Sequence, residues 1–192
     1  MTTYLLHGGR TSILNPQNEK FFGKFAELVD KEEVTILLCY LARAREKWEA
    51  LIEKDSNSIK NNTKKKVNIL IADNPKDLLQ KMDSSDVLYI AGGEAEFIEP
   101  VYKDLVDLKE KIKGKVYAGS SMGAFFASER YVLSLDSQDS NTVHKGIGML
   151  PIQILCHWDI ETEKERKLKL LTDGSEMPTL VLNEFESVVI YK

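Results

Sequence analysis

The stretch that most constrains this chain is residues 116–127, where an apolar run breaks at a serine flanked by glycines. The run over 116–118 is followed by Gly119-Ser-Ser-Met-Gly123 and then by small and apolar residues. This order predicts a strand, a very tight turn and the first turn of a helix. Ser121 has a glycine two places before it and another two places after it, which is the spacing of a nucleophile elbow.

The chemistry of a nucleophilic serine gives a reason for that spacing. At a sharp turn the Oγ of Ser121 stands clear of the backbone, and glycines leave room where a side chain would collide with the neighbouring strand or helix. The N-terminal N–H groups of the following helix, together with its positive dipole end, would stabilise an oxyanion at the same place. The motif alone is equally compatible with a strand–glycine–helix turn that carries an incidental serine.

Length and composition favour one globular domain over residues 1–192. The chain has 192 residues, with 43% hydrophobic and 29% charged side chains, and a formal net charge of −4. That length suffices for a full core, and the negative charge disfavours a nucleic-acid partner. No apolar run is long enough to span a membrane and the N-terminus lacks a signal-peptide pattern, so we expect no membrane association and a cytoplasmic location. Cys39 and Cys156 fit neither a disulfide framework nor a zinc pattern and are expected to be buried thiols.

Apolar periodicity predicts strands that alternate with helices. Continuous apolar runs are typical of strands covered on both faces, and the apolar residues between these runs recur at helical spacing. A polar loop is expected over 55–66 and another over 137–142. The expected strands are 4–6, 34–40, 67–72, 86–91, 115–118, 131–135, 179–182 and 187–191, and the expected helices are 18–29, 43–54, 75–82, 97–113 and 161–171.

Such alternation predicts an α/β fold, a three-layer α/β/α sandwich of the flavodoxin-like, doubly wound kind with a mainly parallel sheet. In such sheets the functional site lies at the carboxyl ends of the strands. Three glycine-rich turns, at 8–9, 92–93 and 119–123, each follow an expected strand. They should therefore gather at one edge of the sheet.

A serine nucleophile needs a base, an acid that orients the base, and an oxyanion hole. The chain has three histidines, His7, His144 and His157. His157 has the best context, because it ends an apolar run downstream of the elbow. The N–H of Met122, directly after the serine, and one N–H of the 92–93 turn are the expected oxyanion donors. The residues alone leave the acid open among Asp136, Asp139, Asp159, Glu161 and Glu184.

Four stretches, in order along nearly the whole chain, resemble the serine-peptidase family of peptidase E (aspartyl dipeptidase) and cyanophycinase. V-L-Y-I-A-G-G-E (87–94) resembles the family's strand that ends in glycines, and V-Y-A-G-S-S-M-G-A-F-F-A (116–127) resembles its G-x-S-A-G-A elbow. I-G-M-L-P-I-Q-I-L-C-H (147–157) resembles its L-x-P-x-Q-I-x-x-H segment, and L-N-E-F-E-S-V-V-I (182–190) resembles its late hairpin. The resemblance implies a class I glutamine amidotransferase-like fold.

Carried over residue by residue, the resemblance implies Ser121 as nucleophile and His157 as base. Counting forward from the elbow places Asp136 where the family has its triad aspartate, with Asp139 as the first substitute. Gly93 and Met122 would supply the oxyanion N–H groups. No metal or organic cofactor is implied, and the implied partner is a small peptide substrate, with the protein a monomer or a homodimer.

Three departures from the family pattern bear on specificity. Met122 stands where the family usually has alanine, Glu94 stands where it has Asn or Asp, and Ala95 stands where a polar residue is common. The carboxylate of Glu94 would repel an acidic substrate side chain and would suit a free α-amino group or a basic side chain. A first-turn acid beside a helix dipole is the structural alternative for Glu94.

These features predict a serine peptidase that cleaves a dipeptide or isopeptide, with an Asp-containing substrate as one option. The alternative is a non-catalytic member of the same fold that binds a small molecule or a protein. A glutamine amidotransferase is disfavoured because that chemistry uses cysteine at the elbow. Arginines at 10, 43 and 45 follow strand ends and are expected either to grip a substrate carboxylate or to form surface ion pairs.

Overall fold

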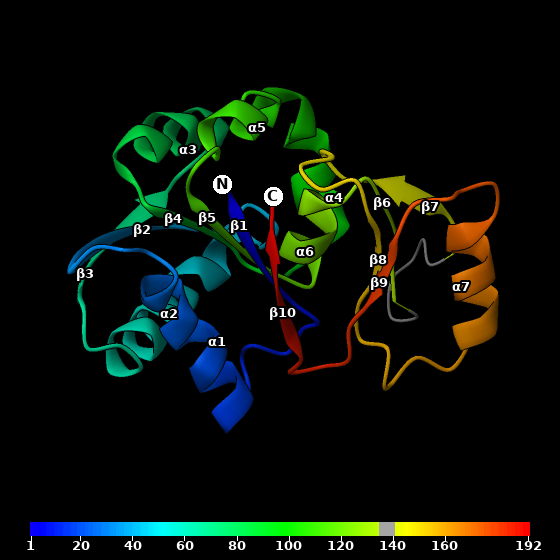
Figure 1. Ribbon diagram of the computed structural model, residues 1–192, viewed down its shortest axis with the longest axis horizontal. Coiled ribbons are helices and arrows are strands. Elements are labelled where there is room, and N and C mark those ends of the chain that lie inside the picture. Colours follow the sequence, from blue (N-terminus) through cyan, green and yellow to red (C-terminus); the bar gives the residue numbers. More distant parts are fainter. Residues whose placement is uncertain (135–140) are drawn as a thin grey trace.

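The computed structural model describes residues 1–134 and 141–192, and its centre is a six-stranded sheet (Figure 1). The strand order is β10-β1-β5-β4-β2-β3. Neighbours from β1 to β3 pair in parallel, and β10 pairs antiparallel with β1 at one edge. The bounds are β1 Thr3–His7, β2 Glu33–Cys39, β3 Lys66–Ala72, β4 Val87–Ile90, β5 Val116–Ser120 and β10 Ser187–Tyr191.

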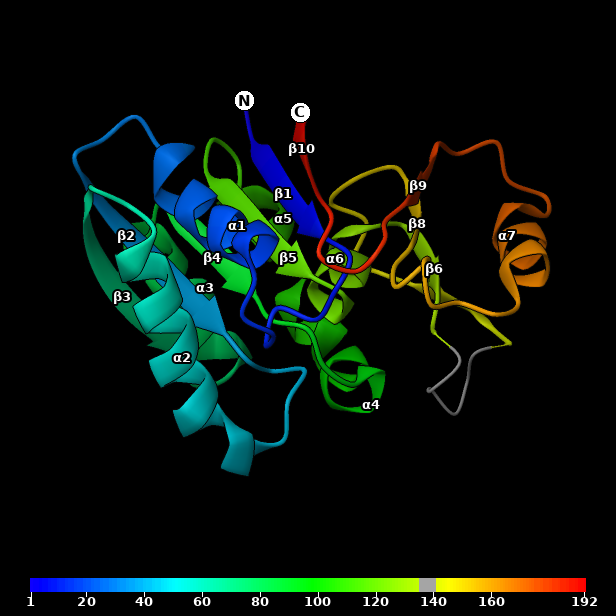
Figure 2. The ribbon, with the colours of Figure 1, turned by 90° about the horizontal axis from the view of Figure 1, so that it is seen from below.

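Helices cover both faces of this sheet (Figure 2). Along β2, Leu37 contributes to the apolar cluster on one face, and its neighbours Ile36 and Leu38 contribute to the cluster on the other, as the alternation of a strand requires. The predicted α/β sandwich with a mainly parallel sheet is confirmed. One face carries α1 (Pro16–Glu27) and α2 (Trp48–Asn61); the other carries α3 (Pro75–Lys81), α4 (Ala95–Ile98), α5 (Leu108–Lys111) and α6 (Met122–Ala127).

A second, four-stranded sheet lies beside the first and was not predicted. Its order is β7-β6-β8-β9, and α7 packs against it (Figure 1). Its strands have three residues each, too few to show a periodicity in the sequence. The bounds are β6 Arg130–Val132, β7 Val143–Lys145, β8 Gln153–Leu155, β9 Thr179–Val181 and α7 Lys164–Thr172.

Two predicted elements need correction. The expected loop over 55–66 is wrong at its start, because α2 continues to Asn61 and buries Asp55, which accepts from the hydroxyl of Tyr40. The expected helix over 97–113 is instead α4, the 3₁₀ segment η3 (Glu99–Leu105) and α5. Pro100 has no N–H to continue an α-helical ladder there. Two further 3₁₀ segments, η1 (Arg45–Lys47) and η2 (Met82–Ser84), flank helices.

Strand β6 ends at Val132, before the end of the predicted strand over 131–135. Asp136 and Asp139 lie outside the described residues. The three glycine-rich turns do gather at one edge of the large sheet, where Gly92, Gly93 and Ser121 line one cleft and Gly9 lies against the ring of His157.

Candidate active site

Ser121 occupies a strained turn between β5 and α6. Its backbone has φ 49° and ψ −108°, a conformation that non-glycine residues rarely adopt. A Cβ on Gly119 would lie 2.5 Å from the carbonyl oxygen of Gly123, and one on Gly123 would lie 2.0 Å from that of Ile90. The two glycines of the motif are therefore needed for close backbone contact, and the strand–turn–helix expected from the sequence is present.

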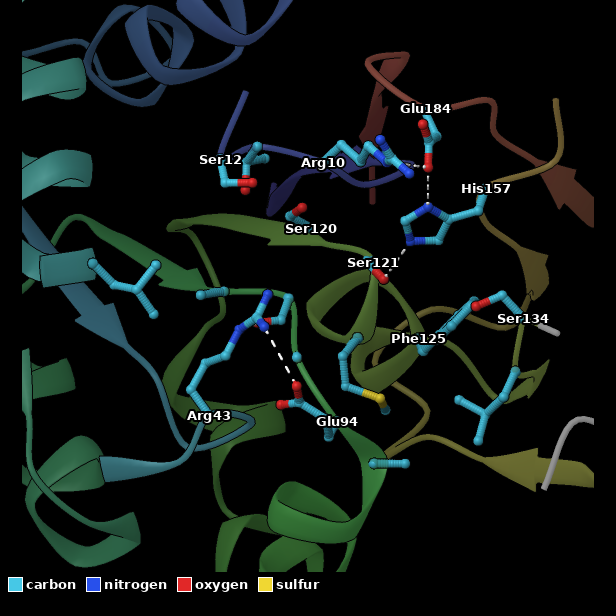
Figure 3. A pocket seen from close by; sticks show the side chains of 18 of the residues that line it. Arg10, Ser12, Arg43, Glu94, Ser120, Ser121, Phe125, Ser134, His157 and Glu184 are labelled. Carbon is cyan, nitrogen blue, oxygen red and sulfur yellow. Dashed lines mark hydrogen bonds and ion pairs between the residues drawn. The ribbon is translucent and has the colours of Figure 1, made fainter. Parts of the chain in front are cut away.

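Two hydrogen bonds link Ser121 to a histidine and a carboxylate (Figure 3). The Oγ of Ser121 lies 2.9 Å from Nε2 of His157, and Nδ1 of His157 lies 2.9 Å from Oε1 of Glu184. An ionised carboxylate only accepts hydrogen bonds. It therefore holds the proton on Nδ1 and leaves the lone pair of Nε2 facing the serine hydroxyl, as a general base requires.

The carboxylate of Glu184 is buried and is held from a second side. Its side chain is 5% exposed, and Nε of Arg10 lies 2.9 Å from the same Oε1 that faces His157. The backbone N–H of Glu184 donates to Oδ1 of Asp159 at 2.8 Å. Arg10 is therefore paired with Glu184. This ion pair offsets the cost of burying the negative charge of the carboxylate.

The other acids left open by the sequence have different places. Oδ1 of Asp159 accepts from the backbone N–H of Glu184, and Glu161 forms a buried ion pair with Lys167 at 2.6 Å. Asp136 and Asp139 are not among the described residues, so their assignment stays a prediction. Glu184 lies in the motif over 182–190, shortly before β10, but no local feature of the sequence distinguishes it from the other four acids.

The expected oxyanion donors line the same cleft. Met122 is the first residue of α6, so its N–H has no acceptor within the helix. In the described part of the chain, neither this N–H nor that of Gly93 forms a hydrogen bond. A Cβ on Gly92 would lie 3.3 Å from Cβ of Ser121, which shows how closely this turn approaches the serine.

Charged side chains line the cleft, which has a volume of about 670 Å³. Glu94 lies at the start of α4, where Oε1 is 3.5 Å from Nη1 of Arg43, and its Oε2 is buried with no hydrogen-bond partner among the described residues. Arg43 also donates to the carbonyl of Gly92. Arg45, by contrast, forms a surface pair with Asp73 and does not line the cleft.

An aromatic stack forms a wall near His144, a histidine that does not follow an apolar run as His157 does. The rings of Phe125 and Tyr131 stack with centroids 4.7 Å apart, and those of Tyr131 and His144 are 5.2 Å apart. Oε1 of Glu99 accepts from Tyr131 and lies 2.8 Å from Nδ1 of His144. These contacts make His144 part of the cleft wall.

The two cysteines are buried, as expected. Burial raises the pKa of the Cys156 thiol, and likewise that of Cys39, so neither is poised as a thiolate. In the described ranges, no group of three or more His, Cys, Asp or Glu side chains could hold a metal ion. No helix in these ranges is long and apolar enough to cross a membrane.

A serine at a strained elbow, bonded to a histidine that is bonded in turn to a buried carboxylate, is the arrangement used by serine hydrolases. The model of Peptidase family S51 matches residues 4–192, and the chain therefore belongs to this family. The family resemblance seen in the sequence is confirmed. The chain is accordingly a serine peptidase of the peptidase E type.

Two solved structures are similar over almost the whole chain. A peptidase from an acI-B1 Actinobacterium has 13% identity and a TM-score of 0.69, covering 99% of this chain and 83% of that one. A putative peptidase E protein from Listeria monocytogenes EGD-e has 18% identity and a TM-score of 0.64, covering 99% and 94%. At these identities the likeness concerns the fold, which is consistent with the glutamine amidotransferase-like class. No curated protein matches the sequence.

Proposed function

We propose that this protein hydrolyses a small peptide, a dipeptide or an isopeptide, through an acyl-enzyme formed on Ser121. The observation that carries the proposal is the continuous array in which both hydrogen bonds, from Ser121 to His157 and from His157 to Glu184, measure 2.9 Å. Glu184 takes the place of the orienting acid here. Asp136, the acid inferred from the family pattern, is the competing assignment.

In the first step Nε2 of His157 takes the proton of the Ser121 hydroxyl as Oγ attacks the carbonyl carbon of the substrate. The resulting imidazolium gives that proton to the leaving amine when the C–N bond breaks. Glu184 stays ionised and stabilises the imidazolium through its bond to Nδ1. Water then attacks the ester under the same general base, which releases the acid product and restores the serine.

The oxyanion formed in each step would accept from the N–H groups of Gly93 and Met122. Both belong to backbone segments held by other contacts, since the N–H of Glu94, next to Gly93, donates to Ala42 at 2.8 Å and the N–H of Ser121 donates to His7 at 2.9 Å. Donors fixed before reaction cost no reorganisation when charge develops. One such donor contributes about 3 kcal/mol to transition-state stabilisation.

The charge of the cleft supports a substrate with a free α-amino group, bound through Glu94. A cleft of about 670 Å³ has the size of a small-ligand site. Among the described side chains that line it, carboxylates outnumber Lys and Arg five to three. The side chain of Glu94 lines the cleft and is 42% exposed, so its carboxylate is an acceptor suited to an ammonium group. The carboxylates in question are Asp55, Glu94, Glu96, Glu99 and Glu184, and the cations are Arg10, Arg43 and Lys54.

A hydrolysis panel read by mass spectrometry tests the proposal. It contains Asp-X, isoaspartyl-X, β-Asp-Arg, and neutral and basic dipeptides, each with a free and an acetylated amino group. We expect turnover of free dipeptides that vanishes in Ser121→Ala. A hydrogen bond to a charged group contributes about 1.5–3 kcal/mol, so Glu94→Gln should lower kcat/KM roughly 10- to 100-fold for free substrates only.

Failure of every substrate would favour the second candidate, a non-catalytic binding protein of the same fold. The side chain of Met122, which stands where the family usually has alanine, is the feature that favours that candidate.

We also propose that residues 1–192 form one domain. A monomer or homodimer and a cytoplasmic location remain predictions.

A further inference from the structure

The segment at the end of β1, residues 7–10, contacts every member of the array at Ser121. The carbonyl of His7 accepts from the N–H of Ser121 at 2.9 Å, and the carbonyl of Gly8 accepts from the N–H of His157 at 3.2 Å. Arg10 holds the carboxylate of Glu184. One short segment therefore connects three residues that are far apart in the sequence.

Gly9 forms the most direct of these contacts. A Cβ built on it would lie 2.1 Å from Cε1 of His157, so the bare backbone of Gly9 lies against the imidazole ring. Its φ of +133° is open to glycine and strained for other residues. The carbonyl of Gly9 accepts from the N–H of Phe185, beside Glu184, at 3.3 Å. The position of Gly9 thus limits where the ring of His157 can lie.

The side chain of His7 forms a hydrogen bond with the backbone of Gly9. Its side chain is fully buried, and Nδ1 accepts the N–H of Gly9 at 3.1 Å. Burial lowers the pKa of His7 to about 4, against an opposing contribution from the Asn18 side chain, and the charge of His157 lowers it further. At neutral pH the ring is therefore uncharged, with the proton on Nε2 and the lone pair of Nδ1 free to accept.

Asn18, on α1, anchors the rest of the loop. It is buried, and its Nδ2 donates to the carbonyls of Arg10 at 2.9 Å and Ile13 at 2.6 Å. These bonds fix the backbone that carries the Arg10 side chain toward Glu184. Asn18 and His7 hold opposite ends of one loop, and neither lines the cleft.

We propose that His7 and Asn18 are positioning residues for hydrolysis, acting on His157 through Gly9 and on Glu184 through Arg10. This inference rests on the proposed function. It differs from simple core packing, because it assigns the effect to one lone pair, at Nδ1 of His7, and to two amide N–H donors of Asn18. A misplacement of about 1 Å in a catalytic group costs on the order of 100-fold in rate.

Paired variants at position 7 test the role of the lone pair. His7→Asn keeps an acceptor close to the place of Nδ1, and His7→Leu removes it. We expect His7→Leu to lower kcat by about 10- to 100-fold with little change in KM, whereas His7→Asn retains most of kcat. Asn18→Leu should behave like His7→Leu. Equal losses in His7→Asn and His7→Leu would overturn the proposal.

Phe21→Leu is the matched packing control. Its ring lies 4.5 Å from that of His7, so the substitution disturbs the same buried side chain and leaves the Nδ1 acceptor in place. We expect a lower Tm with kcat close to that of the wild type. A fall in kcat as large as that of His7→Leu would show that packing alone is responsible and would overturn the proposal.

A spectroscopic readout separates this inference from the proposed function. The Nδ1–H proton of His157, bonded to Glu184, should give a downfield imidazole signal in the proton NMR spectrum of the free protein. We expect the signal to persist in His7→Asn and to broaden or disappear in His7→Leu and Asn18→Leu. An unchanged signal in all three variants would overturn the inference, whatever the hydrolysis panel shows.

Discussion

The six-stranded and four-stranded sheets are stabilised in different ways, and the candidate site lies between them. The large sheet is buried between two extensive apolar clusters, whereas only one face of the small sheet joins one of them, through Tyr131 and Ile154. The other face has a small core of Val132, Leu155 and Leu171 with a few partly buried neighbours. Beside that core lies a buried ion pair, in which Nζ of Lys167 is 2.6 Å from Glu161. The face of the small sheet that carries α7 thus combines a small apolar core with a buried ion pair.

This contrast matters because each sheet contributes one partner of the central hydrogen bond. Ser121 follows β5, inside the large sheet, and His157 follows β8 of the small sheet. The serine is held by its local backbone. The position of His157 depends on contacts that cross between the two regions, at Gly8, Gly9 and Glu184. Substitutions that remove these crossing contacts should therefore lower the rate of hydrolysis strongly, while the stability of the large sheet changes little.

The largest effect is expected from breaking the contact at Glu184. Glu184→Gln keeps the shape of the side chain but can favour the wrong tautomer of His157, which in a comparable triad lowers kcat by about 10⁴-fold. We expect a loss of that order in dipeptide hydrolysis, with the fold of both sheets retained by circular dichroism. Asp136→Asn, measured in parallel, decides the competing assignment: a loss there with Glu184→Gln still active would contradict the role of Glu184.

The next largest effect concerns the ion pair of the small sheet. Lys167→Met leaves the Glu161 carboxylate buried without a cationic partner, and removing one member of such a pair costs about 3–5 kcal/mol. Hydrogen exchange should accelerate at the amides of β6 and β8 while β1 and β5 stay protected. The double variant Lys167→Met with Glu161→Leu should recover most of the loss, because no charge is then left unpaired. Uniform acceleration in both sheets would contradict independent stabilisation of the two regions.

The stability of the large sheet should depend on pH through His7. Its pKa is about 4 in the folded protein against an ordinary value of 6.5, so the unfolded chain binds more protons in that interval. Stability therefore falls as the pH drops from 6.5 towards 4, by up to about 3 kcal/mol. Urea unfolding of wild type and His7→Asn at several pH values measures this. If the free energy of unfolding changes with pH equally in both proteins, His7 is not the source of the pH dependence.

The smallest effect is expected at a surface pair of the large-sheet region. Arg45 and Asp73 are mostly exposed, and the guanidinium also lies 4.1 Å from the ring of Trp48. Arg45→Ala should change stability by less than about 1 kcal/mol. It should leave kcat/KM for every dipeptide unchanged, because Arg45 does not line the cleft. A changed substrate preference in this variant would show that the cleft extends further than its described lining.

The same contrast explains what the sequence could and could not predict. The large sheet has long apolar runs and glycine turns, so its strands and the turn at Ser121 were predicted from local patterns. His157 was predicted from its place at the end of an apolar run and from the resemblance of residues 147–157 to a family segment. The small sheet has three-residue strands and was missed as a sheet.

Glu184 was left open among five acids, because nothing local distinguishes it. Its closeness to His157 arises only when the chain returns from β9 to pair β10 with β1. The bond from Nδ1 of His7 to Gly9 is likewise a property of the folded loop. In the sequence, His7 is simply a histidine followed by two glycines, and no local pattern indicates that its ring is buried.

The most direct test of the central claim is to identify the residue that becomes acylated or phosphonylated. The protein is treated with a small fluorophosphonate, and the modified peptide is sequenced by mass spectrometry, with dipeptide hydrolysis measured on the same samples. The account predicts one adduct per chain, on Ser121, with hydrolysis lost in proportion to labelling and both absent in Ser121→Ala. An adduct on another residue, or hydrolysis that persists in Ser121→Ala, would contradict it.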